Sequence, residues 1–221
     1  MTDRETPSMP AASPDAPAWR LTTTLAAAGA LAGLMIVVVY QWAEPRIEAY
    51  RAHVLQEAIR EVLHDPAAVD TLYVHSGSLE REPPAALDPR QVDRIYVGFD
   101  EAGARVGYAI PAERPGFQDV VRLIFGYDAA RGEVIGMRVL ESKETPGLGD
   151  KIIKDSLFVA EFDGVATPLV GIKAGSGAGD PGEVDMITGA TISSRAVIAA
   201  IEDRLAVLGP LIEAHEREAA R

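Results

Sequence analysis

The distribution of apolar and polar positions divides the chain into a long apolar run, an amphipathic stretch, a series of short strands and a final helix. Residues 21–42 carry no charge, and as a helix they would extend about 33 Å, enough to cross a bilayer. Trp19 precedes this run, and Tyr40 and Trp42 close it, as expected at the membrane surface. A cleaved signal peptide is the alternative, but the run is longer than a usual signal core and no small-x-small site follows it. We predict an uncleaved transmembrane helix at 21–42.

The next stretch has the period of an amphipathic helix, which we expect to continue the membrane helix after a break at Pro45. Its apolar residues recur every three or four positions: Ile47, Tyr50, Val54, Ala58, Ile59 and Val62. Residues 64–90 are rich in Pro, Ala, Asp and Ser, which predicts a loop with at most a short strand at 71–75.

From Val92 onward, β-branched and aromatic runs alternate with turn sequences, a pattern typical of antiparallel strands. These runs occupy residues 94–100, 105–110, 119–128, 133–142 and 168–174. A last apolar stripe predicts a helix capped by Ser193 or Ser194, and it comprises Val197, Ile198, Ile201, Leu205 and Leu208. The fold class is therefore α+β, with helices packed on one face of a twisted antiparallel sheet.

These patterns predict five segments. We expect a disordered tail at 1–20, the transmembrane helix at 21–42, a juxtamembrane helix and loop at 43–90, a folded domain at 91–208, and a solvated C-terminal helix end at 209–221.

Charge and cysteine content exclude several classes of function. The chain has 21 Lys and Arg against 33 Asp and Glu, a net charge of -12, which disfavours a nucleic-acid partner. It has no cysteine, so disulfides, Cys-ligated zinc and the usual iron–sulfur clusters are excluded. The four histidines lack paired ligand spacing, and we expect no metal site. Basic residues flank the apolar run on both sides, but an acidic, cysteine-free body favours a domain outside the cytoplasm.

Residues 185–191, DMITGAT, combine hydroxyl and small residues directly before the last predicted helix. Such a turn would expose Thr191 at a helix N-terminus, where free N–H groups and the helix dipole favour a phosphate. The alternative is that Thr191 only caps the helix.

A second segment, ESKETPGLGDK at 141–151, is a stiff loop punctuated by glycine. Pro146 fixes one dihedral, Gly147 and Gly149 allow close approach to a flat ligand, and Glu144, Thr145 and Lys151 add polar groups. An ordinary turn between strands is the alternative.

Together the anchor, the hairpins, the ETPGLGDKI loop and the DxxTGAT motif resemble the RnfG family, the FMN-binding G subunits of the Rnf-type electron transport complex. That family is related to NqrC of the sodium-translocating NADH:quinone reductase. The resemblance implies that the domain at 91–208 binds FMN, joined by a phosphoester bond to Thr191. It implies that a flavin transferase reads Asp185, Thr188, Gly189 and Ala190. It also implies that the isoalloxazine ring is bordered by Glu144, Thr145, Pro146, Gly147, Leu148 and Gly149.

The implied function is that of an electron-carrier subunit in a membrane-bound, ion-translocating ferredoxin:NAD oxidoreductase. Such a protein is not a complete enzyme, and we expect no acid–base catalytic residue. Its partners would be the other membrane subunits, the flavin transferase and the lipid bilayer, and its FMN domain would face the periplasm from a single-pass anchor in the bacterial inner membrane. Two alternatives stay open. The first is another membrane FMN-binding protein, such as an NqrC-like component of the quinone reductase. The second is a membrane-anchored interaction domain without redox chemistry.

Overall fold

The computed structural model of the protein describes residues 17–85, 87–89 and 91–219. The chain divides into two compact units between Arg51 and Ala52. Most of the expected tail at 1–20 lies outside the described residues, and the first helix begins at Ala18.

Helix α1, Ala18–Val62, contains the apolar run. Within the described residues it is the one helix that is long and apolar enough to cross a membrane, and no protein covers its most apolar stretch. The threonine hydroxyls near its start are hydrogen-bonded to backbone carbonyls of the preceding turn. Thr23 Oγ1 donates to the carbonyl of Trp19 at 2.9 Å, and Thr24 Oγ1 donates to that of Arg20 at 2.7 Å. Bonds of this kind let polar side chains enter an apolar environment.

The expected helix break at Pro45 is wrong, because α1 continues through this residue without interruption. Proline removes one backbone donor and crowds the carbonyl four residues earlier, which bends a helix locally without ending it when both flanking segments are themselves helical. Residues 21–42 and 46–62 each supply such a segment.

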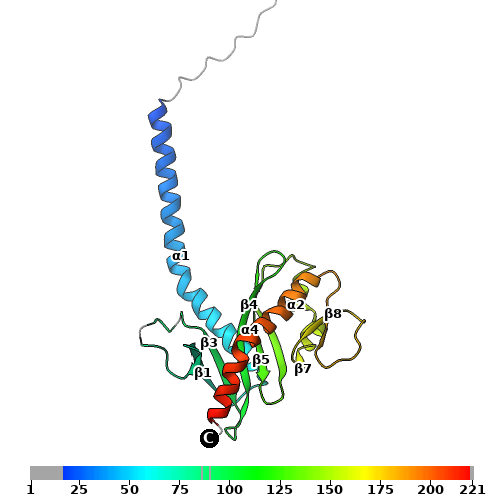
Figure 1. The fold of residues 1–221 in the computed structure, drawn as a ribbon. Helices are drawn as coiled ribbons and strands as arrows, with labels where there is room; N and C mark the ends of the chain where they lie inside the picture. Colours follow the sequence, from blue (N-terminus) through cyan, green and yellow to red (C-terminus); the bar gives the residue numbers. More distant parts are fainter. Residues whose placement is uncertain (1–16, 86, 90, 220–221) are drawn as a thin grey trace, which may run out of the picture. The chain divides into compact units, whose positions relative to one another are not determined.

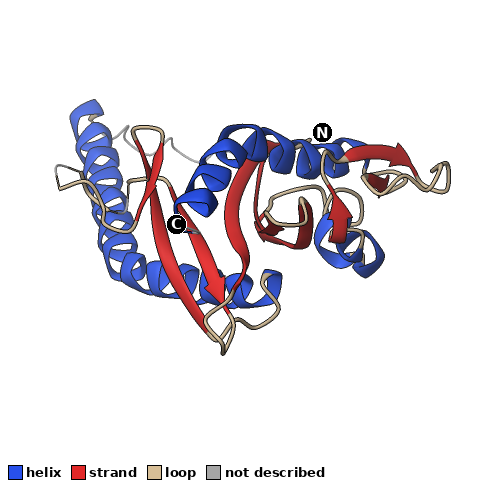
Figure 2. Cartoon of the chain, turned by 60° about the horizontal axis from the view of Figure 1, so that its bottom comes forward, coloured by secondary structure: helices blue, strands red, loops and turns tan. Residues whose placement is uncertain are grey.

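A seven-stranded antiparallel sheet forms the body of the second unit, in the order β2-β1-β3-β4-β5-β6-β7 (Figures 1 and 2). Its strands are β1 (Ala68–His75), β2 (Ser78–Glu80), β3 (Arg94–Phe99), β4 (Arg105–Pro115), β5 (Val120–Asp128), β6 (Glu133–Glu141) and β7 (Asp163–Ala166). Strands β8 (Val170–Lys173) and β9 (Glu183–Met186) form a separate parallel pair.

The four predicted strands between 94 and 142 are confirmed as β3 to β6, and the run at 168–174 contains β8. The segment 43–90 holds more strand than expected, since β1 reaches back to Ala68 and pairs with β3 along its length. Strands β2, β7 and β9 have only three or four residues each, too few for an alternating pattern to reveal them.

Both faces of the sheet are buried, which corrects the expectation of helices on one face. Alternate residues of β4 and β5 enter different cores: Tyr108 and Phe125 lie in the larger cluster, while Ala109 and Ile124 lie in a second cluster. That second cluster also contains Ala58, Ile59, Val62 and Leu63, from the C-terminal end of α1 and the residue after it. Strands that are buried on both faces have nearly continuous apolar sequences. Such a sequence does not show which segments of the chain cover each face.

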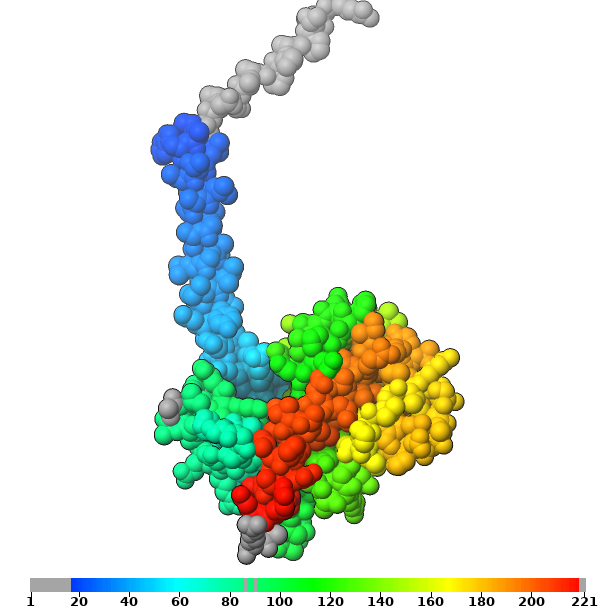
Figure 3. All heavy atoms as spheres, in the orientation of Figure 1, coloured from blue at the N-terminus to red at the C-terminus, as the bar shows by residue number. Residues whose placement is uncertain are grey.

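Helix α4, Thr191–Ala219, packs on the larger cluster and lies at the surface between the β1–β3 segment and the β7–β9 segment (Figure 3). It continues past Pro210, and Ile212 is fully buried. The expected solvated helix end is wrong at Glu216, which accepts a 2.8 Å hydrogen bond from the Tyr108 hydroxyl and pairs with Arg105. Two short helices, α2 (Lys151–Lys154) and α3 (Ser156–Ala160), connect the 141–151 loop to β7.

Candidate functional site

A pocket of about 320 Å³ lies at the N-terminal end of α4. Three segments that are distant in sequence form it: the turn between β4 and β5, the loop after β6, and the turn that leads into α4. Its lining residues are Phe117, Glu144, Thr145, Leu148, Gly149, Gly189, Ala190, Thr191, Ile192 and Ser193. The structure thus brings the two segments singled out in the sequence into one site.

The first turn of α4 leaves its backbone donors free. Ser194 N–H donates to the Ala190 carbonyl at 2.9 Å, which makes Ala190 the N-cap residue, and its methyl group cannot accept a hydrogen bond. In the described part of the chain, the N–H groups of residues 191–193 meet no acceptor. Thr191 is exposed beside them. This arrangement suits an anion held at the helix N-terminus.

Ser193 and Ser194 therefore do not cap the helix, contrary to the sequence-based expectation. They lie inside its first turn, and both are buried. Ser194 Oγ accepts from the Ile187 N–H at 3.1 Å, which fixes the turn at 187–190, and Gly189 in that turn has a φ of 84°. A residue with a Cβ would be strained there.

Glu144 is the most enclosed polar group of the pocket apart from Ser193, with 5% of its surface exposed. Its Oε1 accepts from the N–H groups of Phe117 at 2.9 Å and Gln118 at 3.1 Å, and its Oε2 accepts from Ser193 Oγ at 2.7 Å. Burial opposes ionisation of this carboxyl, but the hydrogen bonds from Ser193, Gln118 and Phe117 outweigh burial and hold its pKa below the ordinary value. Glu144 is therefore an anion at neutral pH.

Two glycines flank the Glu144 carboxylate. A Cβ at Gly116 would lie 2.4 Å from Oε1, and a Cβ at Gly149 would lie 2.5 Å from Oε2 and 2.9 Å from Ser193 Oγ. Any larger residue at either position would displace the carboxylate. Glycine is required here because of close approach, independently of backbone conformation.

Hydrogen bonds to Asp150 and to Gln118 hold the rest of the 144–149 loop. Gly147, with a φ of 79°, donates its N–H to Asp150 Oδ1 at 2.7 Å, and Thr145 Oγ1 donates to Gln118 Oε1 at 3.1 Å. Leu148 is 51% exposed and faces the same pocket as Phe117, 67% exposed, and Ile192, 53% exposed. These three side chains, here called the apolar rim, offer contacts for a flat apolar ligand.

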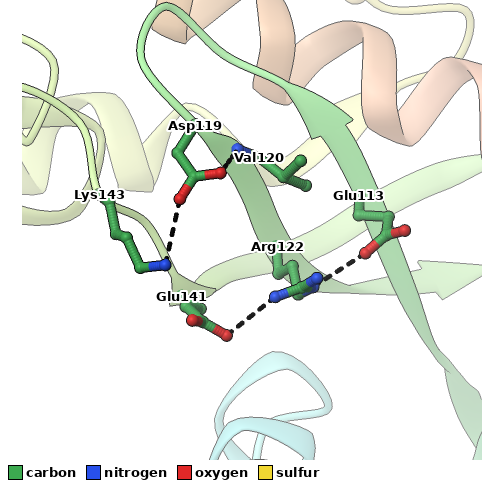
Figure 4. A network of polar contacts seen from close by, with 6 residues as sticks. All are labelled: Glu113, Asp119, Val120, Arg122, Glu141 and Lys143. Atoms are coloured by element: carbon green, nitrogen blue, oxygen red, sulfur yellow. Dashed lines mark hydrogen bonds and ion pairs between the residues drawn. The ribbon is translucent and has the colours of Figure 1, made fainter. Parts of the chain in front are cut away.

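Ion pairs between strands hold the β4–β5 hairpin against the end of β6 (Figure 4). Arg122 bridges Glu113 at 2.9 Å and Glu141 at 3.0 Å, and Lys143 pairs with Asp119 at 3.2 Å. The turn that contains Phe117 is thereby kept beside the loop that contains Glu144.

Not every expected site residue lines the pocket. Pro146 and Gly147 are exposed and do not line it, while Asp185 and Thr188 line a neighbouring hollow of about 620 Å³ beside α3. The Asp185 Oδ2 accepts from the Gly175 N–H at 3.1 Å and so holds the turn after β8.

Phe117, Ile192 and Ser193 line the pocket, although the sequence did not single them out as ligand contacts. Ser193 and Ile192 follow the DxxTGAT motif directly and could have been included on that ground. Phe117 lies in a hairpin turn whose sequence carries no signal of a site.

The comparisons with known proteins agree with this geometry. Residues 116–206 match the FMN-binding domain family, and this match covers all three segments of the pocket. The class defined by fold and site is thus that of FMN-binding proteins.

Two similar relatives narrow the assignment. The chain is 29% identical to the G subunit of the ion-translocating oxidoreductase complex of Methanosarcina acetivorans, over 82% of this chain and 89% of that protein. It is 31% identical to the corresponding G subunit of Pectobacterium atrosepticum, over 83% of this chain and 86% of that protein. The chain belongs to the RnfG family, the G subunits of ion-translocating oxidoreductase complexes.

A solved structure shares the fold. The crystal structure of NqrC from Shewanella oneidensis superposes with a TM-score of 0.59 at 20% identity, over 70% of this chain and 91% of that chain. At this identity the similarity concerns the fold alone.

The residues present fit FMN. The free N–H groups at 191–193 suit its phosphate, and the apolar rim suits its ring system. The volume of the pocket lies at the low end for small-molecule sites.

Proposed function

We propose that this protein is the electron-carrier subunit of a membrane-bound, ion-translocating Rnf-type ferredoxin:NAD oxidoreductase, with FMN attached to Thr191 through a phosphoester bond. The observation that carries this proposal is the exposed Thr191 beside three free backbone N–H groups at the mouth of an apolar-rimmed pocket. Membership in the RnfG family supports the assignment to a multi-subunit complex.

When bound, FMN supplies one-electron and two-electron transfer at its isoalloxazine ring. The chain contributes position and environment. The Thr191 hydroxyl would anchor the phosphate, the N–H groups of 191–193 would donate to it, and the apolar rim would contact the ring. In this proposal the chemistry belongs to the isoalloxazine ring, and the protein serves as its carrier.

We further propose that residues 21–42 anchor the protein in the bacterial inner membrane and that the FMN domain lies on the periplasmic side. The lack of cysteine and the acidic composition favour that side. Its partners are then the lipid bilayer, the other membrane subunits of the complex, and a flavin transferase that reads the 185–191 motif. The exposure of Thr191 and Gly189 leaves that motif accessible to such an enzyme.

The test is the intact mass of the full-length chain produced in membranes together with a flavin transferase. The parent should gain the mass of one FMN less one water, and Thr191→Ala should gain nothing. Thr191→Ser, which keeps the hydroxyl, is the matched control and should retain some attached flavin. An unmodified parent, with the transferase shown to be active on another substrate protein, would contradict covalent attachment.

The fold shared with NqrC supports one second candidate, an NqrC-like component of a sodium-translocating NADH:quinone reductase. Both candidates predict a flavin-bearing protein, so the subunits that copurify from native membranes distinguish them. A membrane-anchored domain without redox chemistry predicts a colourless protein instead.

A further inference from the structure

The Glu144 carboxylate is a charge with no cationic partner in the pocket. Within the described residues no basic side chain forms an ion pair with it. Two basic side chains of the neighbouring segments are engaged elsewhere: Lys143 pairs with Asp119 at 3.2 Å, and Arg122 pairs with Glu113 and Glu141 (Figure 4). Among the described residues, the negative charge of Glu144 is thus stabilised by hydrogen bonds and not by an ion pair.

Those dipoles come from two different segments. The N–H groups of Phe117 and Gln118 are obligate donors, so Oε1 must act as an acceptor, and the third donor, Ser193 Oγ, belongs to the first turn of α4. One carboxylate therefore joins the turn between β4 and β5, the loop after β6 and the start of α4. A Cβ at Gly116 or at Gly149 would overlap this carboxylate, so both glycines are needed for it to occupy its position.

We infer that Glu144 is a positioning residue whose fixed negative charge also lowers the midpoint potential of the flavin. This inference rests on the proposed function. A group that gains an electron beside a fixed anion is harder to reduce, because the added charge is repelled. Ser193 moderates the effect, since its hydroxyl dipole directs positive charge at Oε2.

Two substitutions separate charge from position. Glu144→Gln keeps the length of the side chain and an oxygen that accepts from the two N–H groups, while its amide can donate to Ser193 Oγ. Ser193→Ala keeps the anion and removes one donor. Glu101→Gln is the matched control, because Glu101 is exposed in the turn between β3 and β4 and does not line the pocket.

The experiment is a spectroelectrochemical titration of the full-length, flavin-loaded chain, with flavin content measured by intact mass. Glu144→Gln should shift the midpoint potential in the positive direction, Ser193→Ala in the negative direction, and Glu101→Gln should leave it unchanged. A loaded Glu144→Gln chain with the potential of the parent would overturn the inference.

Should Glu144→Gln fail to fold or to load flavin, Ser193→Ala decides. Without the Ser193 hydroxyl, the Glu144 carboxylate loses one donor, and the midpoint potential of the flavin should shift in the negative direction. A midpoint potential that is unchanged or more positive than that of the parent would overturn the inference. A parent chain without flavin is a different outcome, because it contradicts the proposed function and not the role of Glu144.

Discussion

Ser193 Oγ donates a 2.7 Å hydrogen bond to Glu144 Oε2, and so joins the first turn of α4 to a loop 49 residues earlier in the chain. Both side chains are buried, at 2% and 5% exposure. The contact links the two sequence segments that carry the site, and both residues line the same pocket as Thr191.

Glu144 should make the stability of the protein depend on acidic pH. Its pKa in the folded protein lies below the ordinary value of 4.5, so its contribution is complete above that value and is lost as pH falls through the lower folded pKa. The free energy of unfolding of Glu144→Gln, measured by denaturant titration in detergent, should therefore fall less than that of the parent between about pH 6 and pH 3. Glu101→Gln should follow the parent. An equal fall in Glu144→Gln and parent would show that Glu144 is not ionised in the fold.

Gly149→Ala should destabilise the protein by about 1–3 kcal/mol, because the new methyl group would overlap Glu144 Oε2 and Ser193 Oγ. The matched control is Gly209→Ala in α4, where a Cβ meets no atom within 4 Å. That change should be neutral or should stabilise by up to about 1 kcal/mol through helix propensity. Thermal unfolding of the two variants measures the difference, and equal melting temperatures would contradict the close contact at Gly149.

Asp185→Asn should lower the fraction of chains that carry flavin, because it removes the carboxylate from the motif and keeps an oxygen that can accept from Gly175 N–H. The turn after β8 and the acceptor Thr191 then remain in place. Intact mass after production with a flavin transferase gives the fraction. Asp180→Asn, on the exposed loop between β8 and β9, is the control and should load like the parent. Full flavin loading of Asp185→Asn would show that the transferase does not recognise the charge of Asp185.

Gly126→Ala should destabilise the second unit by roughly 2 kcal/mol or more. A Cβ at Gly126 would lie 2.1 Å from the Val62 carbonyl oxygen, so the residues that cover this face of the sheet would have to move away. Denaturant unfolding of the variant, compared with Gly209→Ala, provides the measurement. A stability close to that of the parent would argue against the close packing of residues 58–63 on the sheet.

Local sequence patterns predicted the elements that depend on the properties of residues close together in the chain. The uncharged run at 21–42, the alternating strands from β3 to β6 and the apolar stripe of α4 follow from side-chain periodicity and hydrophobicity. The same applies to the exposure of Thr191 at a helix N-terminus, because small residues and a glycine precede a strongly periodic helix.

Only the tertiary structure decided which residues meet. Sequence alone assigned Ser193 or Ser194 to the helix cap, since a serine before an apolar stripe has that local meaning. The fold instead turns the Ser193 hydroxyl onto Glu144. Phe117 became part of the site because β4 and β5 pair and place their turn beside the loop after β6. Periodicity reports which positions are buried but not which segment buries them. The double covering of the sheet and the joining of three segments at one carboxylate therefore required the folded chain.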